Sequence, residues 1–144
     1  MSDADYRAIS RIKGVYCDTI DRIVRDQQPG DAALLASLWT EDAVFDFTGI
    51  DGNIYRGREA IVALFTGFHV ENIDWMWHAV SSEVIDINGD TAQGRWTLHA
   101  QGLSKERTSD APNHVYGRYI DEFRKENGVW RQSKLFFLNE TKGA

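Results

Sequence analysis

The hydropathy pattern of this chain changes its period once, near Ile73, and that change restricts the fold more than any other feature. Before this point apolar residues recur at helical spacings of three and four, and after it four long extended segments follow one another. The breaks between these segments fall at 88–90, 104–113 and 126–128, and Asn-Gly pairs in the first and third predict antiparallel hairpins. Helices followed by strands are typical of an α+β domain with helices on one face of a sheet.

The first helix is predicted from Ser2 to about Asp26, because one apolar stripe runs along it. Ser2 and Asp5 form a capping-box-like pair at its start. The members of the stripe are Ile9, Ile12, Tyr16, Ile20 and Ile23.

A second helix is predicted from Ala32 to about Thr40, with Asp31 as its cap, after a break at 27–30. A short strand at 43–47 and an extended piece at 54–56 follow. A third helix is expected from Arg58 to about Phe68. The whole pattern predicts one α+β domain over residues 1–144, in which a cone-shaped, strongly curved antiparallel sheet packs against about three helices of the N-terminal half. The space between sheet and helices is the natural pocket for a small apolar ligand.

Composition excludes several classes of protein. The 144 residues are 42% apolar and carry a net charge of −6, which is the wrong sign for binding nucleic acid. No stretch is long and apolar enough to predict a membrane span, and no basic leader precedes an apolar run. The single cysteine, Cys17, predicts no internal disulfide, so we expect a protein of the reducing cytoplasm.

No histidine stands in a metal-ligand spacing and no nucleotide-binding motif occurs, so we expect neither metal nor cofactor.

Three residues are candidates for chemistry. Asp21 lies on the shoulder of the apolar stripe, where it either enters the pocket edge or pairs with Arg25 or Lys13 at the rim. Tyr16 lies within the stripe, either as a core residue or as a buried phenol that donates a hydrogen bond.

His78 lies in the first long strand, between tryptophan and methionine residues on one side and Ala79 on the other. Such surroundings favour the neutral imidazole that a general base requires, although many strand histidines only pack. His99 is expected to point away from the interior, since Trp96 and Leu98 alternate with it. His114 begins the next strand and shares a face with Tyr116.

The order of elements and several sequence strings resemble the SnoaL-like branch of the nuclear transport factor 2-like superfamily. The strings that carry the resemblance are Tyr16-x4-Asp21, 35–43, 55–61, His78, 117–123 and 128–131. The chain is most similar to the group that contains scytalone dehydratase, bile-acid 7α-dehydratase and γ-hexachlorocyclohexane dehydrochlorinase. The resemblance implies elimination without a cofactor by an aspartate–histidine dyad, with Asp21 and His78 at the dyad positions and Tyr16 at the tyrosine position of the bile-acid enzyme.

The chain departs from these relatives at the substrate-binding positions. Leu135 stands where the dehydrochlorinase has an arginine, and only His99 is available for the acidic partner of the bile-acid enzyme. We expect an apolar, ring-containing hydroxy-carbonyl ligand, and assembly of two or three copies through the sheet. The predicted substrate-binding residues are Trp39, Phe65, Met76, Trp96, His114, Tyr116 and Leu135.

Three functions follow from this reading. The first is a dehydratase-like lyase in which His78 is the base, Asp21 orients it and Tyr16 donates to the oxyanion or leaving oxygen. The second is a double-bond isomerase that uses the same dyad. The third is a non-catalytic module for ligand binding or dimerisation, or a small accessory subunit resembling that of ring-hydroxylating dioxygenases.

Overall fold

The computed structural model describes residues 2–141. The helical elements belong to the first half of the chain: α1 (Asp3–Asp26), α2 (Asp31–Ser37), α3 (Arg58–Ala63), the π-helical η1 (Leu64–His69) and α4 (Val70–Asn72). The strands are β1 (Trp39–Phe47), β2 (Asn53–Arg56), β3 (Ile73–Asn88), β4 (Thr91–Ser104), β5 (Asn113–Glu126) and β6 (Val129–Asn139).

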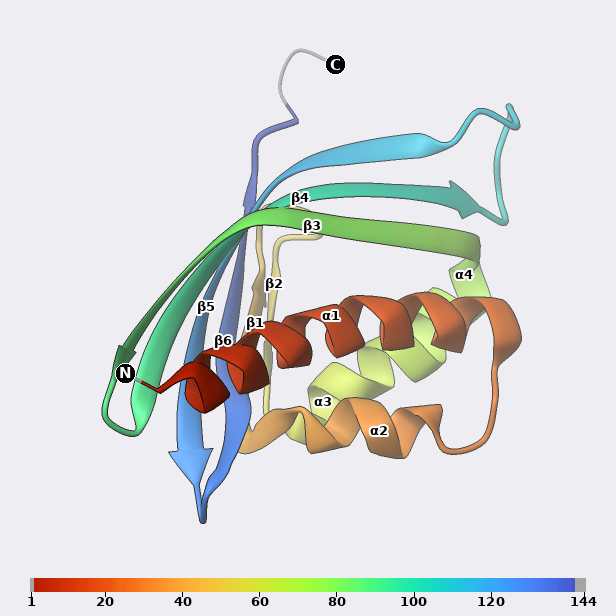
Figure 1. Cartoon of the computed structure of the whole chain (residues 1–144). Helices are drawn as coiled ribbons and strands as arrows, with labels where there is room; N and C mark the ends of the chain where they lie inside the picture. Colours follow the sequence, from red (N-terminus) through yellow and green to blue (C-terminus); the bar gives the residue numbers. More distant parts are fainter. Residues whose placement is uncertain (1, 142–144) are drawn as a thin grey trace.

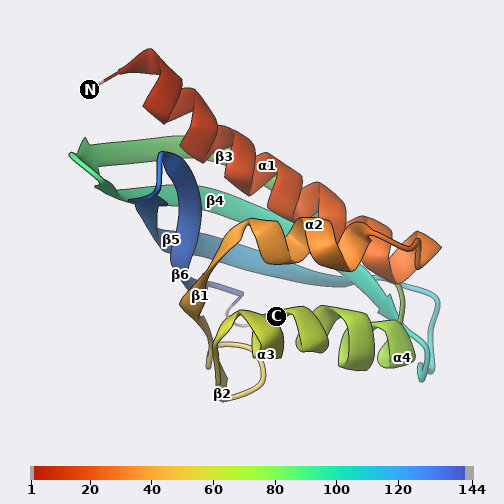
Figure 2. The same cartoon turned by 90° about the horizontal axis from the view of Figure 1, so that it is seen from below.

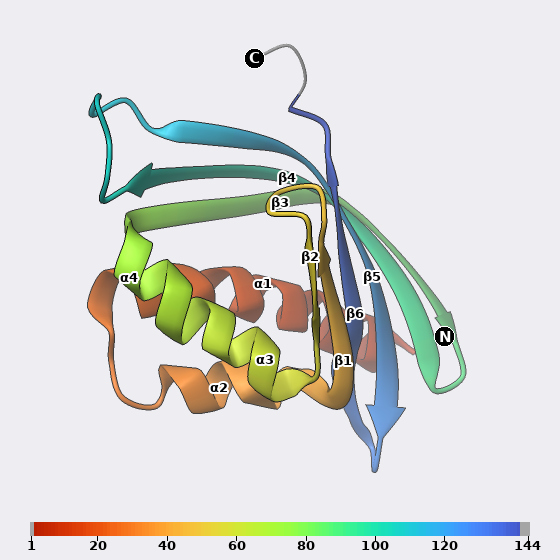
Figure 3. The same cartoon turned by 180° about the vertical axis from the view of Figure 1, so that it is seen from behind.

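All six strands form one sheet in the order β2-β1-β6-β5-β4-β3, so β2 and β3 are its edges. Figure 1 shows the long strands bending over the helices, and Figures 2 and 3 show the helices gathered on the hollow side of that bend. α1 packs along β3 and reaches β6. This is the curved α+β cone that the sequence predicts, and the sheet does not close into a barrel.

The helical start and the hairpins agree with the local signals. The Ser2 hydroxyl accepts a hydrogen bond from the backbone N–H of Asp5 at 3.1 Å, as the capping pattern predicts. Positive φ angles of 52° at Asn127 and 79° at Gly128 form the two-residue turn between β5 and β6. Gly89, with φ of 61°, opens the turn between β3 and β4.

Several local expectations were wrong. α2 ends at Ser37, and Trp39 and Thr40 begin β1 instead of ending the helix. The residue that precedes α2 as its cap is Gly30, with φ of 95°, while the Asp31 carboxylate binds Arg22. β1 also pairs with β6 in parallel, although every other strand pair is antiparallel.

The parallel pair brings Trp39 beside Gln132, and the Arg58 side chain donates two hydrogen bonds to the Trp39 carbonyl at 3.0 and 2.7 Å. These nonlocal bonds explain why the chain leaves the helical conformation early. The third helix is also longer than predicted, because the π-helical turn η1 and α4 continue it to Asn72.

The core lies between the apolar stripe of α1 and the inner face of the sheet. Tyr16 lies at the centre of an aromatic cluster, with ring centroids 5.9 Å from Trp39, 6.1 Å from Phe65 and 6.0 Å from Tyr119. All of these rings are buried. The cluster holds α1 against β1, β5 and η1, and so fixes where the C-terminal half of α1 meets β3.

Candidate active site

Asp21 of α1 and His78 of β3 meet where the helix crosses the edge strand. The Asp21 Oδ1 atom lies 2.6 Å from His78 Nδ1, and Oδ2 accepts the backbone N–H of His78 at 2.9 Å. Both carboxylate oxygens therefore hold one residue, although the two positions are 57 apart in the chain. The two hydrogen bonds, one to the ring and one to the backbone of His78, fix the position and orientation of the imidazole.

The hydrogen bond also sets the tautomer of His78. An ionised carboxylate only accepts hydrogen bonds, so in the neutral imidazole the proton is on Nδ1 and Nε2 keeps a free lone pair. The side chains of Asp21 and His78 are each 14% exposed, so solvent still reaches the pair. An oriented imidazole with a reachable Nε2 lone pair is the arrangement of a general base.

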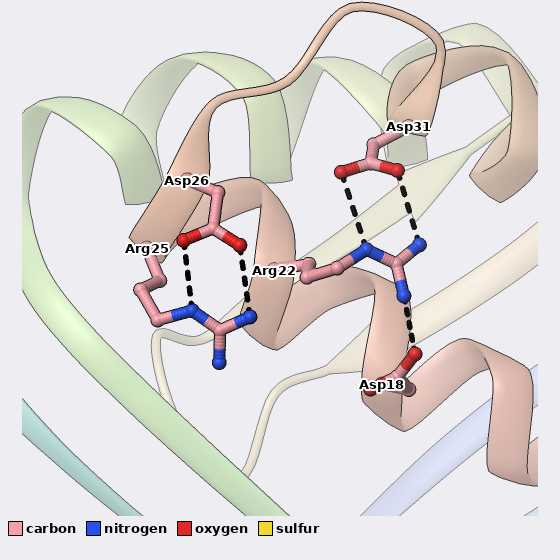
Figure 4. Close-up of polar contacts among 5 residues, drawn as sticks. All are labelled: Asp18, Arg22, Arg25, Asp26 and Asp31. Carbon is pink, nitrogen blue, oxygen red and sulfur yellow. Dashed lines mark hydrogen bonds and ion pairs between the residues drawn. The ribbon is translucent and has the colours of Figure 1, made fainter.

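The alternative partners that the sequence offers for Asp21 are occupied elsewhere. Figure 4 shows Arg25 bound to Asp26, with N–O distances of 2.8 and 2.9 Å, and Arg22 bound to Asp18 and Asp31. Lys13 is buried against a different carboxylate. The interpretation of Asp21 as a rim acid paired with Arg25 or Lys13 is therefore wrong.

Tyr16 lies on the same helix as Asp21 and is 1% exposed. Burial raises the pKa of its phenol well above the usual value, and the negative charge of Asp21 acts in the same direction. The phenol therefore stays protonated at neutral pH and keeps the proton that a hydrogen-bond donor needs.

Five of the predicted substrate-binding residues are buried in the interior: Trp39, Phe65, Met76, Trp96 and Leu135. Among them, Trp96 belongs to a separate group, because its indole N–H donates to Glu83 at 3.1 Å and its ring lies 5.6 Å from the Lys13 ammonium. Leu135 is fully buried beside β1, where it pairs in register with Phe45.

His114 and Tyr116 do not face the interior, so their assignment as substrate-binding residues is corrected. Alternation along β5 places Gly117 and Tyr119 inside and these two residues outside. On the outer face they stack with His99, whose ring centroid lies 5.5 Å from His114 and 4.7 Å from Tyr116. His99 points away from the interior, as its strand pattern predicts.

Assembly of copies through this outer face stays a prediction. Trp77 extends the same aromatic surface, with its ring centroid 5.7 Å from His99.

Sequence analysis missed a buried ion pair. The ammonium of Lys13 lies 2.6 Å from Asp121 Oδ2, and both side chains are 0% exposed. Lys13 is four residues after Ile9 and three before Tyr16, so its place on the apolar stripe was the available signal. Its partner on β5 is set by the tertiary fold and has no local signal.

The surface hollows that can be described lie away from the dyad. None of the five is lined by Asp21 or His78. One of about 160 Å³ lies at the C-terminal end of α1, between Ile23, Gln27 and Val70.

Within residues 2–141 no group of three or more His, Cys, Asp or Glu side chains is arranged to hold a metal ion. Over the same range, no helix has both the length and the apolar character needed to cross a bilayer.

A family model described as "SnoaL-like domain" matches residues 3–135. The chain belongs to the SnoaL-like domain family. This family is part of the nuclear transport factor 2-like superfamily, and the curved α+β fold described above is the fold of that superfamily. A comparison with curated protein sequences gave no match.

Solved structures of SnoaL-like shape cover nearly the whole chain. A putative aromatic ring hydroxylase from Novosphingobium aromaticivorans is 24% identical with a TM-score of 0.80, over 98% of this chain and 92% of its own. A putative scytalone dehydratase from the same organism is 21% identical with a TM-score of 0.80, over 96% and 85%. A hexachlorocyclohexane dehydrochlorinase is 22% identical with a TM-score of 0.73, over 98% and 95%. At these identities the likeness establishes a shared fold.

Proposed function

We propose that this SnoaL-like protein is a cofactor-independent enzyme that removes a proton from carbon, with His78 as the general base, and so catalyses an elimination. The observation that carries the proposal is the 2.6 Å hydrogen bond between Asp21 Oδ1 and His78 Nδ1. A non-catalytic binding module has no need of a histidine whose ring and backbone N–H are both bound by one carboxylate. Two structural neighbours, named as a putative scytalone dehydratase and a hexachlorocyclohexane dehydrochlorinase, agree with this class of reaction.

In the proposed dehydration, His78 Nε2 takes a proton from a carbon that a neighbouring carbonyl makes acidic. The electron pair of the broken C–H bond moves into the carbonyl as an enolate, and then forms the carbon–carbon double bond as the β-hydroxyl departs. The imidazolium returns its proton to the departing oxygen, so that water leaves. Asp21 stabilises the imidazolium, and Tyr16 donates a hydrogen bond to the enolate or to the departing oxygen.

The proposed substrate is a small, neutral, ring-containing hydroxy-carbonyl compound. Aromatic and apolar side chains dominate the interior of the domain between the helices and the sheet, among them Phe65 and Met76. Such walls favour an apolar ring over a charged ligand.

The second candidate is a double-bond isomerase, because the same imidazole can return the proton to a different carbon of the substrate. The two reactions differ in product mass. Dehydration loses one water, whereas isomerisation leaves the mass unchanged.

The test is a screen of cyclic hydroxy-ketones and enones with product mass spectrometry. His78→Ala and Asp21→Asn are each expected to lower turnover by roughly 10²–10⁴-fold, the usual contribution of a placed base. His99→Ala is the matched control, since this imidazole lies on the outer face and its loss should leave turnover unchanged. Turnover near the wild-type rate in both dyad variants would overturn the proposal.

A further inference from the structure

A hollow of about 540 Å³ lies between the N-terminal half of α1, α2 and the turn that joins β5 to β6. In Figure 1 these three elements lie at the same end of the molecule. Asp21, His78 and Tyr16 are not among the lining residues, so the hollow is separate from the dyad. Ligand sites in proteins usually enclose about 300–1,000 Å³, so this hollow is large enough for a small organic molecule.

Apolar side chains form most of the wall of this hollow. Ile12, Leu38 and Trp130 line it and are each at most 9% exposed. Leu34 of α2 and Val129 of β6 also line it, and they remain 38% and 49% exposed. Water that contacts apolar side chains is released when an apolar ligand covers them, so the hollow favours an aromatic or alkyl group.

Three charged side chains line the hollow, and two of them neutralise each other. Asp5 accepts hydrogen bonds from the Lys125 ammonium at 3.2 Å and from the Trp130 indole N–H at 2.8 Å. The Ser2 hydroxyl donates to the other oxygen of the same carboxylate, also at 2.8 Å. The charges of Asp5 and Lys125 therefore balance, and the third charged side chain is that of Arg11.

Arg11 is exposed and takes part in none of the ion pairs formed among residues 2–141. The residues three and four positions before and after it on α1 are arginine, alanine, glycine and valine, so its own helix offers no acid to pair with it. Among the described residues, Asp5 is the only acid that lines the hollow. In a chain with a net charge of −6, this wall thus carries a cation for which the protein supplies no counter-charge.

We propose that this hollow is a second ligand site, which binds a small amphipathic carboxylate with its aromatic or alkyl body against Leu34 and Val129 and its carboxylate on Arg11. A guanidinium presents parallel N–H donors that match the two oxygens of a carboxylate, and such charge-assisted pairs are stronger than neutral hydrogen bonds. A neutral ligand of the same shape gains only the apolar contacts. The inference does not depend on the proposed function, because it uses none of the dyad residues.

Titration of the full chain with two matched probes, 2-naphthylacetate and 2-naphthylacetamide, tests the inference. The probes share a ring system and differ in the charge of the side group. Binding is followed by ¹H–¹⁵N NMR, in which the Trp130 indole N–H and the backbone amides of Leu34 and Val129 should shift. The carboxylate should bind about three- to fivefold more tightly than the amide, the upper range for an exposed ion pair. High salt should remove most of this preference.

Four variants separate the charge from the apolar wall. Arg11→Gln should lower the affinity for the carboxylate to that for the amide, whereas Arg7→Gln removes the same charge from the same helix outside the hollow and should keep the preference. Leu34→Ser removes apolar surface and should weaken binding of both probes by at least about threefold. Leu138→Ser is its control, because Leu138 is 39% exposed and lies outside the hollow, so both affinities should stay unchanged.

Equal affinity of the wild type for the two probes, or absence of binding by both, would overturn the inference. The same conclusion would follow from an equal loss of preference in Arg7→Gln and Arg11→Gln, or from shifts confined to residues outside the hollow. Failure of the base assignment would appear separately, as turnover that survives in His78→Ala.

Discussion

Replacement of Lys13 by methionine breaks the buried ion pair that joins α1 to β5. The ammonium lies 2.6 Å from Asp121 Oδ2 and 3.6 Å from the ring centroid of Tyr119, with no solvent exposure of either charged side chain. In Lys13→Met, Gln132 Nε2, at 3.2 Å, is the remaining donor to that carboxylate. A buried charge that loses its partner costs about 3–5 kcal/mol, so we expect a loss of that size in the free energy of unfolding at neutral pH.

The pH dependence of this loss distinguishes an ion-pair effect from simple loss of packing. Burial raises the pKa of Asp121 to about 6, even though Lys13 acts to lower it. Without Lys13 the pKa of Asp121 rises further, while in the unfolded chain it stays near the ordinary value. A carboxyl group whose pKa is raised by folding costs no stability in acid, and destabilises progressively as the pH rises through its folded-state pKa. The deficit of Lys13→Met should therefore be smaller at about pH 5 than at about pH 8.

Urea denaturation followed by tryptophan fluorescence at these two pH values measures the deficit. Asp121→Asn is the matched variant, because it leaves the ammonium without its counter-charge, and acid does not relieve that deficit. The double variant Lys13→Met/Asp121→Leu should recover most of the loss, since an apolar pair of similar volume often replaces a buried ion pair without cost. A deficit below about 1 kcal/mol, or one that is equal at both pH values, would refute the reasoning.

Three further predictions concern stability and titration. Leu135→Ala creates a cavity at a fully buried position and should lower the free energy of unfolding by about 2–5 kcal/mol in a urea titration. Leu138→Ala, at a position 39% exposed, is the control and should cost below about 1 kcal/mol in the same experiment. Gly14→Ala lies in the middle of α1 with nothing within 4 Å of the added Cβ, so thermal unfolding should show a gain of about 0.5–1 kcal/mol. The pKa of Asp5 is lowered to about 2, mainly by the hydrogen bond that Trp130 donates to its carboxylate. Carboxyl NMR should therefore find Asp5 ionised down to that pH, and Trp130→Phe should raise the pH midpoint of its titration.

The features that could be predicted from sequence are those with a local cause. The change of period near Ile73 and the Asn-Gly turns depend on neighbouring residues, and the structure confirms the elements that they predict. Residue spacing also predicted that Asp21 lies on the shoulder of the α1 stripe and that His78 lies in a strand. The contact between the two depends on how α1 crosses β3, and only the family resemblance predicted that contact.

The features that were missed depend on contacts between distant segments. The run that ends at Trp39 is apolar enough for either a helix or a strand, and its parallel pairing with β6 decides the outcome. Asp31 has the chemistry of a helix cap, yet Arg22 on the preceding helix takes its carboxylate. The outward direction of Tyr116 follows from the alternation set by Gly117, but only once the register of β5 is known.

The most direct test of the central claim is exchange of the acidic α-protons of a small cyclic ketone such as 2-tetralone for deuterium, followed by proton NMR in D2O. This reaction needs a base at carbon and no leaving group, so it isolates the step assigned to His78. The assignment of His78 as the base predicts that the wild type accelerates exchange, and that His78→Ala and Asp21→Asn each lose roughly 10²–10⁴-fold of that rate. Exchange at the full wild-type rate in both variants, or no acceleration by the wild type, would contradict it.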